Sequence, residues 1–159
     1  MDQQTKNLLI VLYEPAYREA FATLNEAWIA RYFSLEPHDI EQLHHPEKYI
    51  LAEGGQIWCA ITESGVVAGT VALVASGAGQ YEMAKMSVAD AFQGRGLGRR
   101  LGEAAIEWAR EQGATRLWLE SNRRLAPALH LYETLGFREV PLVPSPYARA
   151  DIRMELSLP

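Results

Sequence analysis

The sequence is poor in several features that would point to particular classes of protein. Cys59 is the only cysteine among 159 residues, which excludes a disulfide within the chain and fits a reducing compartment. The 15 lysines and arginines are outnumbered by 20 acidic residues, and the net charge of −5 argues against a nucleic-acid partner. The longest mostly apolar stretch, residues 66–75, is too short to cross a bilayer as a helix, so no membrane partner is expected.

The chain also lacks signs of division or targeting. It contains no low-complexity segment, repeat or linker, and its length suits one domain over residues 1–159. The polar N-terminus, MDQQTKN, has no signal-peptide pattern, so we expect a cytoplasmic protein. No cluster of cysteines and histidines has the spacing of a zinc site, and we expect no bound metal.

Apolar periodicity predicts the order β–α–α–β–β–β–α–β–α–β–β. Antiparallel hairpins come first and β–α–β crossovers follow, which predicts an α+β fold with one mixed sheet and helices on its faces. The expected strands are 8–13, 57–64, 66–75, 81–88, 115–120, 137–142 and 151–158; the expected helices are 15–33, Pro37 to just before Pro46, about 96 to Gly113, and 125–136.

A glycine-rich loop joins the strand at 81–88 to the helix that begins near residue 96. Gly94, Gly96 and Gly98 allow close approach to the main chain, and arginines lie between and beside them. The N-terminus of a helix presents unpaired N–H groups and a partial positive charge, which together bind anions, phosphates above all. The loop therefore predicts a phosphate site on an otherwise acidic protein.

Two common phosphate motifs are absent from this loop. No Lys-Ser or Lys-Thr pair follows a glycine at the spacing of a P-loop, and G-x-G-x-x-G fails because its third glycine would fall on Arg99 or Leu101. The pattern that does match is Q-x-x-G-x-G, from Gln93 to Gly98. The alternative is a helix cap whose glycines serve packing.

This loop resembles the acyl-CoA pyrophosphate loop of the GNAT superfamily of N-acyltransferases. Two further features lie where the family has them: Asn122 follows a strand, and LYETLGF at 131–137 matches the family's L-Y-x-x-x-G-F. The resemblance implies a mixed, mostly antiparallel central sheet flanked by helices on both faces. It also implies an acetyl-CoA-dependent N-acetyltransferase that acts on a primary amine of a small molecule by direct attack in a ternary complex.

The resemblance further implies which residues hold the cofactor. A local bulge in the strand 81–88 would splay it from the strand 115–120, and pantetheine would lie in the gap. Main-chain groups of the segment Met86, Ser87 and Val88 would hold the pantetheine amides, and Asn122 would bind CoA nearby; an alternative for Asn122 is a helix N-cap. The loop residues that would grip the pyrophosphate are Gln93, Gly94, Arg95, Gly96, Leu97, Gly98 and Arg99.

Two residues are implied in catalysis. The family often places a general base at the position of Glu82, and its usual proton donor to the departing thiolate matches Tyr132. In a strand without a bulge, period two would put Glu82, Ala84, Met86 and Val88 on one face. The alternatives are an exposed strand glutamate and a core aromatic residue.

Four residues near the family's acceptor site are candidates for binding an acceptor carboxylate: Arg31, Tyr32, Tyr147 and Arg149. Arginine suits bidentate carboxylate binding, so an amino-acid or peptide-like amine would follow. The alternative is surface charge with packing aromatics. Other functions left open are transfer of a longer acyl group, acetylation of a protein N-terminus or lysine, and a CoA-binding regulatory module without turnover. The resemblance also implies a homodimer through the C-terminal strands.

Overall fold

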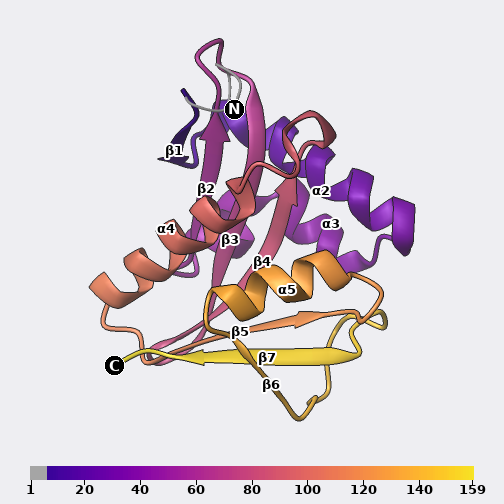
Figure 1. Cartoon of the computed structure of the whole chain (residues 1–159), viewed down its shortest axis with the longest axis vertical. Helices are drawn as coiled ribbons and strands as arrows, with labels where there is room; N and C mark the ends of the chain where they lie inside the picture. The colour runs from indigo at the N-terminus through magenta and orange to yellow at the C-terminus, as the bar shows by residue number, and fades with distance from the viewer. Residues whose placement is uncertain (1–6) are drawn as a thin grey trace.

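The structure, a computed structural model, describes residues 7–159. Residues 1–6, which contributed to the prediction of a cytoplasmic protein, lie outside the described residues. Within residues 7–159, seven strands form one sheet in the order β1-β2-β3-β4-β5-β7-β6 (Figure 1). The strands are β1 (Leu9–Leu12), β2 (Gln56–Ile61), β3 (Val67–Gly77), β4 (Gln80–Val88), β5 (Arg116–Ser121), β6 (Arg138–Val140) and β7 (Ile152–Ser157).

The longer helices lie where the periodicity predicts them. They are α2 (Arg18–Tyr32), α3 (Pro37–His44), α4 (Leu97–Glu111) and α5 (Ala126–Thr134). The short helical turn η1 (Pro15–Tyr17) forms the start of the helix predicted over residues 15–33, whereas η2 (Glu47–Leu51) and η3 (Asp90–Phe92) were not predicted. The predicted order of elements and the α+β class are confirmed. None of the helices in residues 7–159 has both the length and the apolar character needed to span a membrane.

Helices cover both faces of the sheet, which gives two apolar cores. In Figure 1, α4 and α5 lie in front of the sheet, and α2 and α3 lie behind it. Strand β2 shows how the two cores share one strand: Trp58 and Ala60 join the core under α4, whereas Ile57 and Cys59 join the core under α2. Because successive side chains of a strand alternate in direction, a strand buried on both faces reads as a continuous apolar run.

Strands β4 and β5 stay together for only part of their length. They pair in parallel through Gln80 with Arg116, Tyr81 with Leu117, and Glu82 with Trp118, and no further pair follows. Beyond these pairs, β4 runs upward in Figure 1 while β5 and β7 run across the view. The splay that the family resemblance implied is therefore present, and it leaves one edge of β4 without a strand neighbour from Met83 onward.

A bulge in β4 changes which side chains face which side. The register between β3 and β4 shifts between Thr70 and Ala72, and Lys85 has a φ of 55°, in the left-handed region that non-glycine residues rarely adopt. Met86 and Val88 pack against the α4 core, while the hydroxyl of Ser87 donates to a main-chain oxygen of α2. The bulge that the resemblance implied is therefore present, and the shared face expected for a strand without a bulge does not form: Met86 and Val88 lie on the opposite face from Glu82.

Candidate active site

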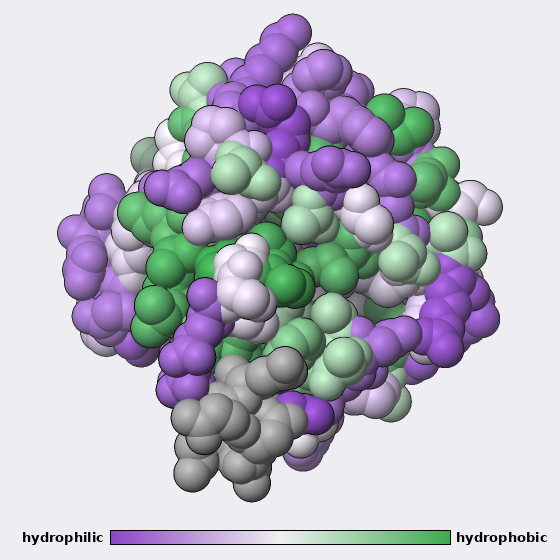
Figure 2. Space-filling view, turned by 90° about the horizontal axis from the view of Figure 1, so that it is seen from above, coloured by the Kyte–Doolittle hydropathy of each residue, from purple (hydrophilic) through white to green (hydrophobic). Residues whose placement is uncertain are grey.

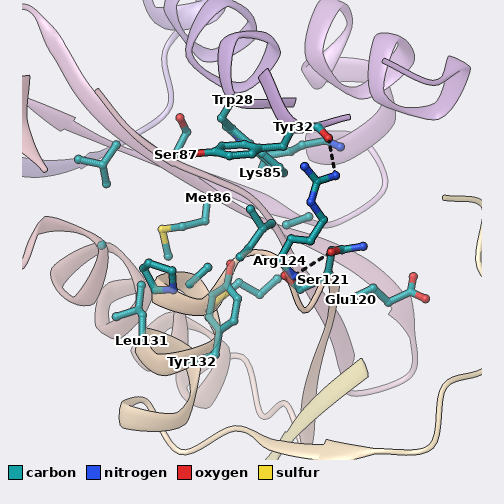
Figure 3. Close-up of a pocket in the computed structure, with 18 of the residues that line it drawn as sticks. Trp28, Tyr32, Lys85, Met86, Ser87, Glu120, Ser121, Arg124, Leu131 and Tyr132 are labelled. Carbon is teal, nitrogen blue, oxygen red and sulfur yellow. Dashed lines mark hydrogen bonds between the residues drawn. The ribbon is translucent and has the colours of Figure 1, made fainter. Parts of the chain in front are cut away.

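A cavity of about 480 Å³ lies where β4 and β5 diverge. Its wall combines the C-terminal end of α2, the exposed part of β4, the glycine loop, the end of β5 and the helix α5. Figure 3 shows Trp28 and Tyr32 on one side of the cavity and Leu131 and Tyr132 on the other. Figure 2 views the end of the molecule where the glycine loop lies: apolar side chains gather near the centre of this face within a polar border.

The glycine loop has the conformation that its residues predict. Gly94 and Gly96 both have a φ of 75°, and a Cβ added to either would meet no atom within 4 Å. The backbone conformation therefore requires glycine at both positions, and open space lies over both residues. Gly96 caps α4, and the N–H of Arg100 bonds to its carbonyl oxygen at 3.2 Å. Helix geometry leaves the earlier N–H groups of this first turn without acceptors inside the helix.

Five of the seven predicted loop residues line the cavity: Gln93, Gly94, Gly96, Leu97 and Gly98. The side-chain amide of Gln93 donates to the oxygen of Val88 at 3.1 Å and to Asp90 at 3.3 Å, which fixes the start of the loop against the end of β4. The two arginines of the loop, Arg95 and Arg99, do not line the cavity. Arg95 lies beside the ring of Phe92, and Arg99 forms an ion pair with Glu103 at 2.8 Å.

The last glycine of the motif also serves helix packing. A Cβ on Gly98 would lie 2.9 Å from a methyl group of Leu131, and one on Gly102 would lie 2.5 Å from a methyl group of Leu135. These pairs are four residues apart on each helix, so the glycines form a groove in α4 that receives a ridge of α5. The alternative of a glycine that serves packing is therefore confirmed for Gly98. At Gly94 and Gly96 an added Cβ would meet no atom within 4 Å, so packing does not require glycine there.

Glu82 is a buried carboxylate at the wall of the cavity. It is only 8% exposed, and no hydrogen bond to its side chain comes from residues 7–159. Burial, opposed by the charge of Lys85 and aided by that of Glu120, raises the pKa of Glu82 to about 7. The exposed strand glutamate considered as an alternative is thus excluded.

Tyr132 reaches the cavity from α5. Its ring packs edge-on against Phe137 at 6.2 Å, and its hydroxyl points toward the centre of the cavity (Figure 3). Burial raises the pKa of Tyr132 to about 12. The ring therefore belongs to the apolar core, as the alternative expected, while the hydroxyl faces the cavity.

Asn122 lines the cavity and organises the loop after β5. Its side-chain oxygen accepts from the N–H of Arg124 at 2.9 Å, and its amide donates to the oxygen of Arg149 at 2.8 Å. The alternative of a helix N-cap is wrong, because the cap of α5 is Leu125. Asn122 instead ties the end of β5 to the segment before β7.

The four acceptor candidates have different surroundings. Tyr32, Tyr147 and Arg149 line the cavity, whereas Arg31 does not and lies 4.0 Å from Asp90 on the surface. Arg149 makes two hydrogen bonds of 2.7 Å to Asp39. The geometry therefore does not support a role for Arg31 and Arg149 in binding an acceptor carboxylate.

The structure adds a buried charge network that the sequence did not indicate. The ammonium of Lys85, on the bulge, lies 2.7 Å from Asp39 of α3 and 3.1 Å from the hydroxyl of Tyr147. Desolvation lowers the pKa of Lys85, and the charge of Asp39 opposes this. No sequence spacing relates residues 39, 85 and 147, so only the fold could reveal the network. Glu120, a further lining residue, was detectable as a polar residue near the end of a predicted strand.

Known proteins share both the sequence pattern and the fold. A model of the Acetyltransferase (GNAT) family matches residues 17–137. Streptothricin acetyltransferase of Streptomyces lavendulae is 46% identical over 52 residues, which are 33% of this chain and 28% of that protein. The [ribosomal protein bS18]-alanine N-acetyltransferase of Salmonella typhimurium is 43% identical over 60 residues, which are 38% of this chain and 40% of that protein.

The structure of YncA from Salmonella typhimurium, solved with its cofactor acetyl-CoA, superposes with a TM-score of 0.72 at 23% identity, over 96% of this chain and 95% of that one. The chain spans from about a quarter to about half of the length of the curated relatives it matches. The family model covers most of the chain, and the seven-stranded sheet is the one found in solved acetyltransferases. The chain therefore belongs to the GNAT family of acetyltransferases.

Proposed function

We propose that the protein is an N-acetyltransferase that moves the acetyl group of acetyl-CoA to a primary amine of a small molecule within a ternary complex. One observation carries the proposal: Glu82, a buried carboxylate with no hydrogen-bond partner in the described part of the chain, lines the same cavity as an open glycine loop at a helix N-terminus. A base and an anion site in one cavity are what amine acetylation from a CoA thioester requires.

The loop fits a CoA diphosphate. Gly94 and Gly96 leave open space over the main chain, and the residues that begin α4, Gly96, Leu97 and Gly98, line that end of the cavity. The edge of β4 beyond Glu82 offers main-chain groups for the pantetheine amides, and Asn122 lies on the opposite wall. Bound there, acetyl-CoA would supply a thioester carbonyl open to attack by an amine.

Glu82 is proposed to remove the proton from the acceptor ammonium. An ordinary glutamate has a pKa near ~4.3, far below the ~8 of an α-amino group or the ~10 of an alkyl amine. With its pKa raised to about 7, Glu82 is a stronger base and remains ionised above neutral pH. Burial thus provides the raised pKa that this role requires and that the sequence alone could not show.

Tyr132 is proposed to donate a hydrogen bond to the departing thiolate. Its pKa of about 12 lies above the ~8.5 of a thiol, so complete transfer of the phenol proton to sulfur would be uphill. A hydrogen bond requires no such transfer and still stabilises the developing charge. We therefore expect a modest contribution from Tyr132.

The test is thiol release from acetyl-CoA, measured against a broad panel of primary amines, together with calorimetric titration of CoA. We expect CoA binding and thiol release that depends on a small amine. Binding without release for any amine, peptide or protein would identify a regulatory module instead. Release with proteins or peptides alone would make the acceptor a macromolecule. Failure to bind CoA would overturn the proposal as a whole.

A further inference from the structure

Glu120 lies at the end of the cavity away from the glycine loop. In Figure 3, Leu131 and Met86 occupy one side of the cavity and Glu120 lies on the far side from them. Strand β5 carries Glu120 just beyond the point where pairing with β4 stops. The proposed CoA site therefore occupies one end of the cavity, and Glu120 belongs to the end left for the acceptor.

Two carboxylates at this end lack cationic hydrogen-bond partners. One oxygen of Glu120 accepts from the hydroxyl of Ser145 at 2.9 Å, and the other, Oε2, is buried without a partner in residues 7–159. Glu82 is more than nine-tenths buried, lines the same cavity and likewise has no hydrogen-bond partner there. A buried carboxylate without a partner is costly, so the arrangement suits a ligand that brings the missing cations.

The cations around the cavity are already engaged. Lys85 and Arg149 both bond to Asp39, and Arg149 also lies 3.2 Å from Glu36. Arg124 is exposed and donates to the main-chain oxygen of Tyr32 at 3.2 Å. The two buried cations are thus balanced by two acidic side chains.

Arg153, the residue paired with Glu120 across β5 and β7, is engaged elsewhere as well. Its Nε lies 3.3 Å from Glu155, and its guanidinium stacks over Trp118 at 4.1 Å. Glu82 and Glu120 therefore have no ion-pair partner among residues 7–159. Burial raises the pKa of both carboxyl groups, and the charge of Arg153 still acts against this rise.

Aromatic side chains complete this part of the wall. Trp28, Tyr32, Phe33 and Tyr147 all line the cavity. Cations of the protein already lie over three of these rings: Lys85 and Arg149 over Tyr147, Arg124 over Phe33, and Arg31 over Tyr32. The rings therefore offer mainly apolar surface on which an alkyl chain can pack. The surroundings thus combine apolar contact area with two negative groups, which is the complement of an amine that carries more than one positive charge.

We propose that the acceptor is a diamine or polyamine, with the reacting amino group at Glu82 and a second ammonium held by Glu120. This inference rests on the proposed function and names its substrate class. Glu120 acts here by binding alone, and no bond to it forms or breaks. The proposal replaces the carboxylate-bearing acceptor that the sequence suggested, because Arg149 is paired and Arg31 lies outside the cavity wall.

The experiment compares three acceptors of equal chain length, cadaverine, pentylamine and aminovalerate, at a pH above the pKa of Glu82. We expect the highest kcat/KM for cadaverine. Glu120→Gln keeps an oxygen to accept the Ser145 hydrogen bond but removes the charge. It should lower kcat/KM for cadaverine by about 10- to 100-fold, the range of a charge-assisted hydrogen bond. The change for pentylamine should be much smaller, and it should reflect only the lower pKa of Glu82 once the charge of Glu120 is removed. In calorimetry, Glu120→Gln should weaken cadaverine binding to the CoA-loaded protein.

Ser145→Ala is the matched control, since it removes the hydrogen bond and keeps the carboxylate. It should retain the preference for cadaverine. A preference for aminovalerate, or an equal loss for cadaverine and pentylamine in Glu120→Gln, would overturn the diamine proposal and leave N-acetyltransferase activity standing. Absence of both CoA binding and thiol release would instead overturn the proposed function, and the acceptor proposal with it.

Discussion

At the glycine-loop end of the cavity the proposed binding surface is main chain, whereas at the Glu120 end it consists of side chains. The loop end uses contiguous residues, 93–99, and two of its arginines lie outside the cavity wall. The opposite end brings together α3, β4, β5 and the segment before β7, through Asp39, Lys85, Glu120 and Tyr147. One end depends on local conformation, and the other on tertiary contacts.

This difference separates the two substrates. A diphosphate is recognised by main-chain N–H groups, which any sequence with the right glycines can present. An acceptor is recognised by charges whose strength depends on burial and on pairing with distant residues. We therefore expect variants at the loop to affect the cofactor and stability, and variants at the buried end to affect chemistry, pH dependence and the choice of acceptor.

The largest effect is expected for Glu82→Gln. Loss of a general base lowers rates by about 10²- to 10⁴-fold, so kcat should fall within this range while CoA binding persists. In the unchanged protein, kcat should fall as the pH drops below about 7, because the base becomes protonated. Measuring kcat over a range of pH for Glu82→Gln and for the unchanged protein tests both expectations. An acidic limb that survives in Glu82→Gln would remove Glu82 from the mechanism.

Asp39→Asn should give the largest loss of stability. It leaves Lys85 and Arg149 without their shared carboxylate, and breaking a buried ion pair costs about 3–5 kcal/mol. Burial alone would raise the pKa of Asp39, but hydrogen bonds from Arg149 and Lys85 lower it to about 2. Its stabilisation is therefore present above pH 3.8 and is lost as the pH falls toward 2.

Denaturant unfolding of Asp39→Asn at neutral and acidic pH provides the measurement. Glu41→Gln, an exposed position on the same helix, is the control and should leave stability unchanged. Equal stability of Asp39→Asn and the unchanged protein would show that the network does not hold α3 against the bulge.

A third prediction concerns the stability of Glu82→Gln. The folded pKa of Glu82, about 7, exceeds its ordinary value of 4.5, so the folded state favours the protonated form. The associated stabilisation is complete below pH 4.5 and is lost as the pH rises through about 7. Relative to the unchanged protein, Glu82→Gln should therefore gain about 2–3 kcal/mol between these limits. A pH-independent difference in unfolding free energy would contradict the buried, ionising carboxylate.

Gly96→Ala tests the loop end. Forcing a Cβ into the left-handed region costs about 1–2 kcal/mol, and the added methyl group would also enter the open space over the loop. We expect a lower Tm and a higher KM for acetyl-CoA. Gly65→Ala in the β2–β3 turn has a similar φ of 87° and open surroundings, so it should lower Tm similarly without changing KM. A matching rise in KM for both would refute a cofactor role for Gly96.

The smallest effect is expected for Tyr132→Phe. Loss of one hydrogen bond to the leaving group should lower kcat by no more than about tenfold, with little change in KM. Tyr81→Phe, on β4 outside the cavity wall, is the control and should leave kcat unchanged. A loss as large as that of Glu82→Gln would mean that Tyr132 transfers a proton rather than donating a hydrogen bond.

Much of the fold could be predicted because periodicity is a local property. The order of elements followed from runs such as residues 66–75 and from glycines that end helices, and Gly113 and Gly136 indeed have positive φ values after α4 and α5. The bulge at Lys85 could not be read from apolar spacing. It depends on the pairing of β3 with β4, and it reversed the faces assigned to Met86 and Val88.

The sequence by itself determined the loop that starts α4, because three glycines and a following helix set its conformation, and the anion site proposed there, from neighbouring residues alone. Only the tertiary structure decided what the charged residues of the cavity do. The pKa of Glu82 is raised to about 7 because the residue is buried, and Arg149 is engaged because Asp39 lies against it. Burial and pairing arise from contacts between distant segments, and these contacts exist only once the chain has folded.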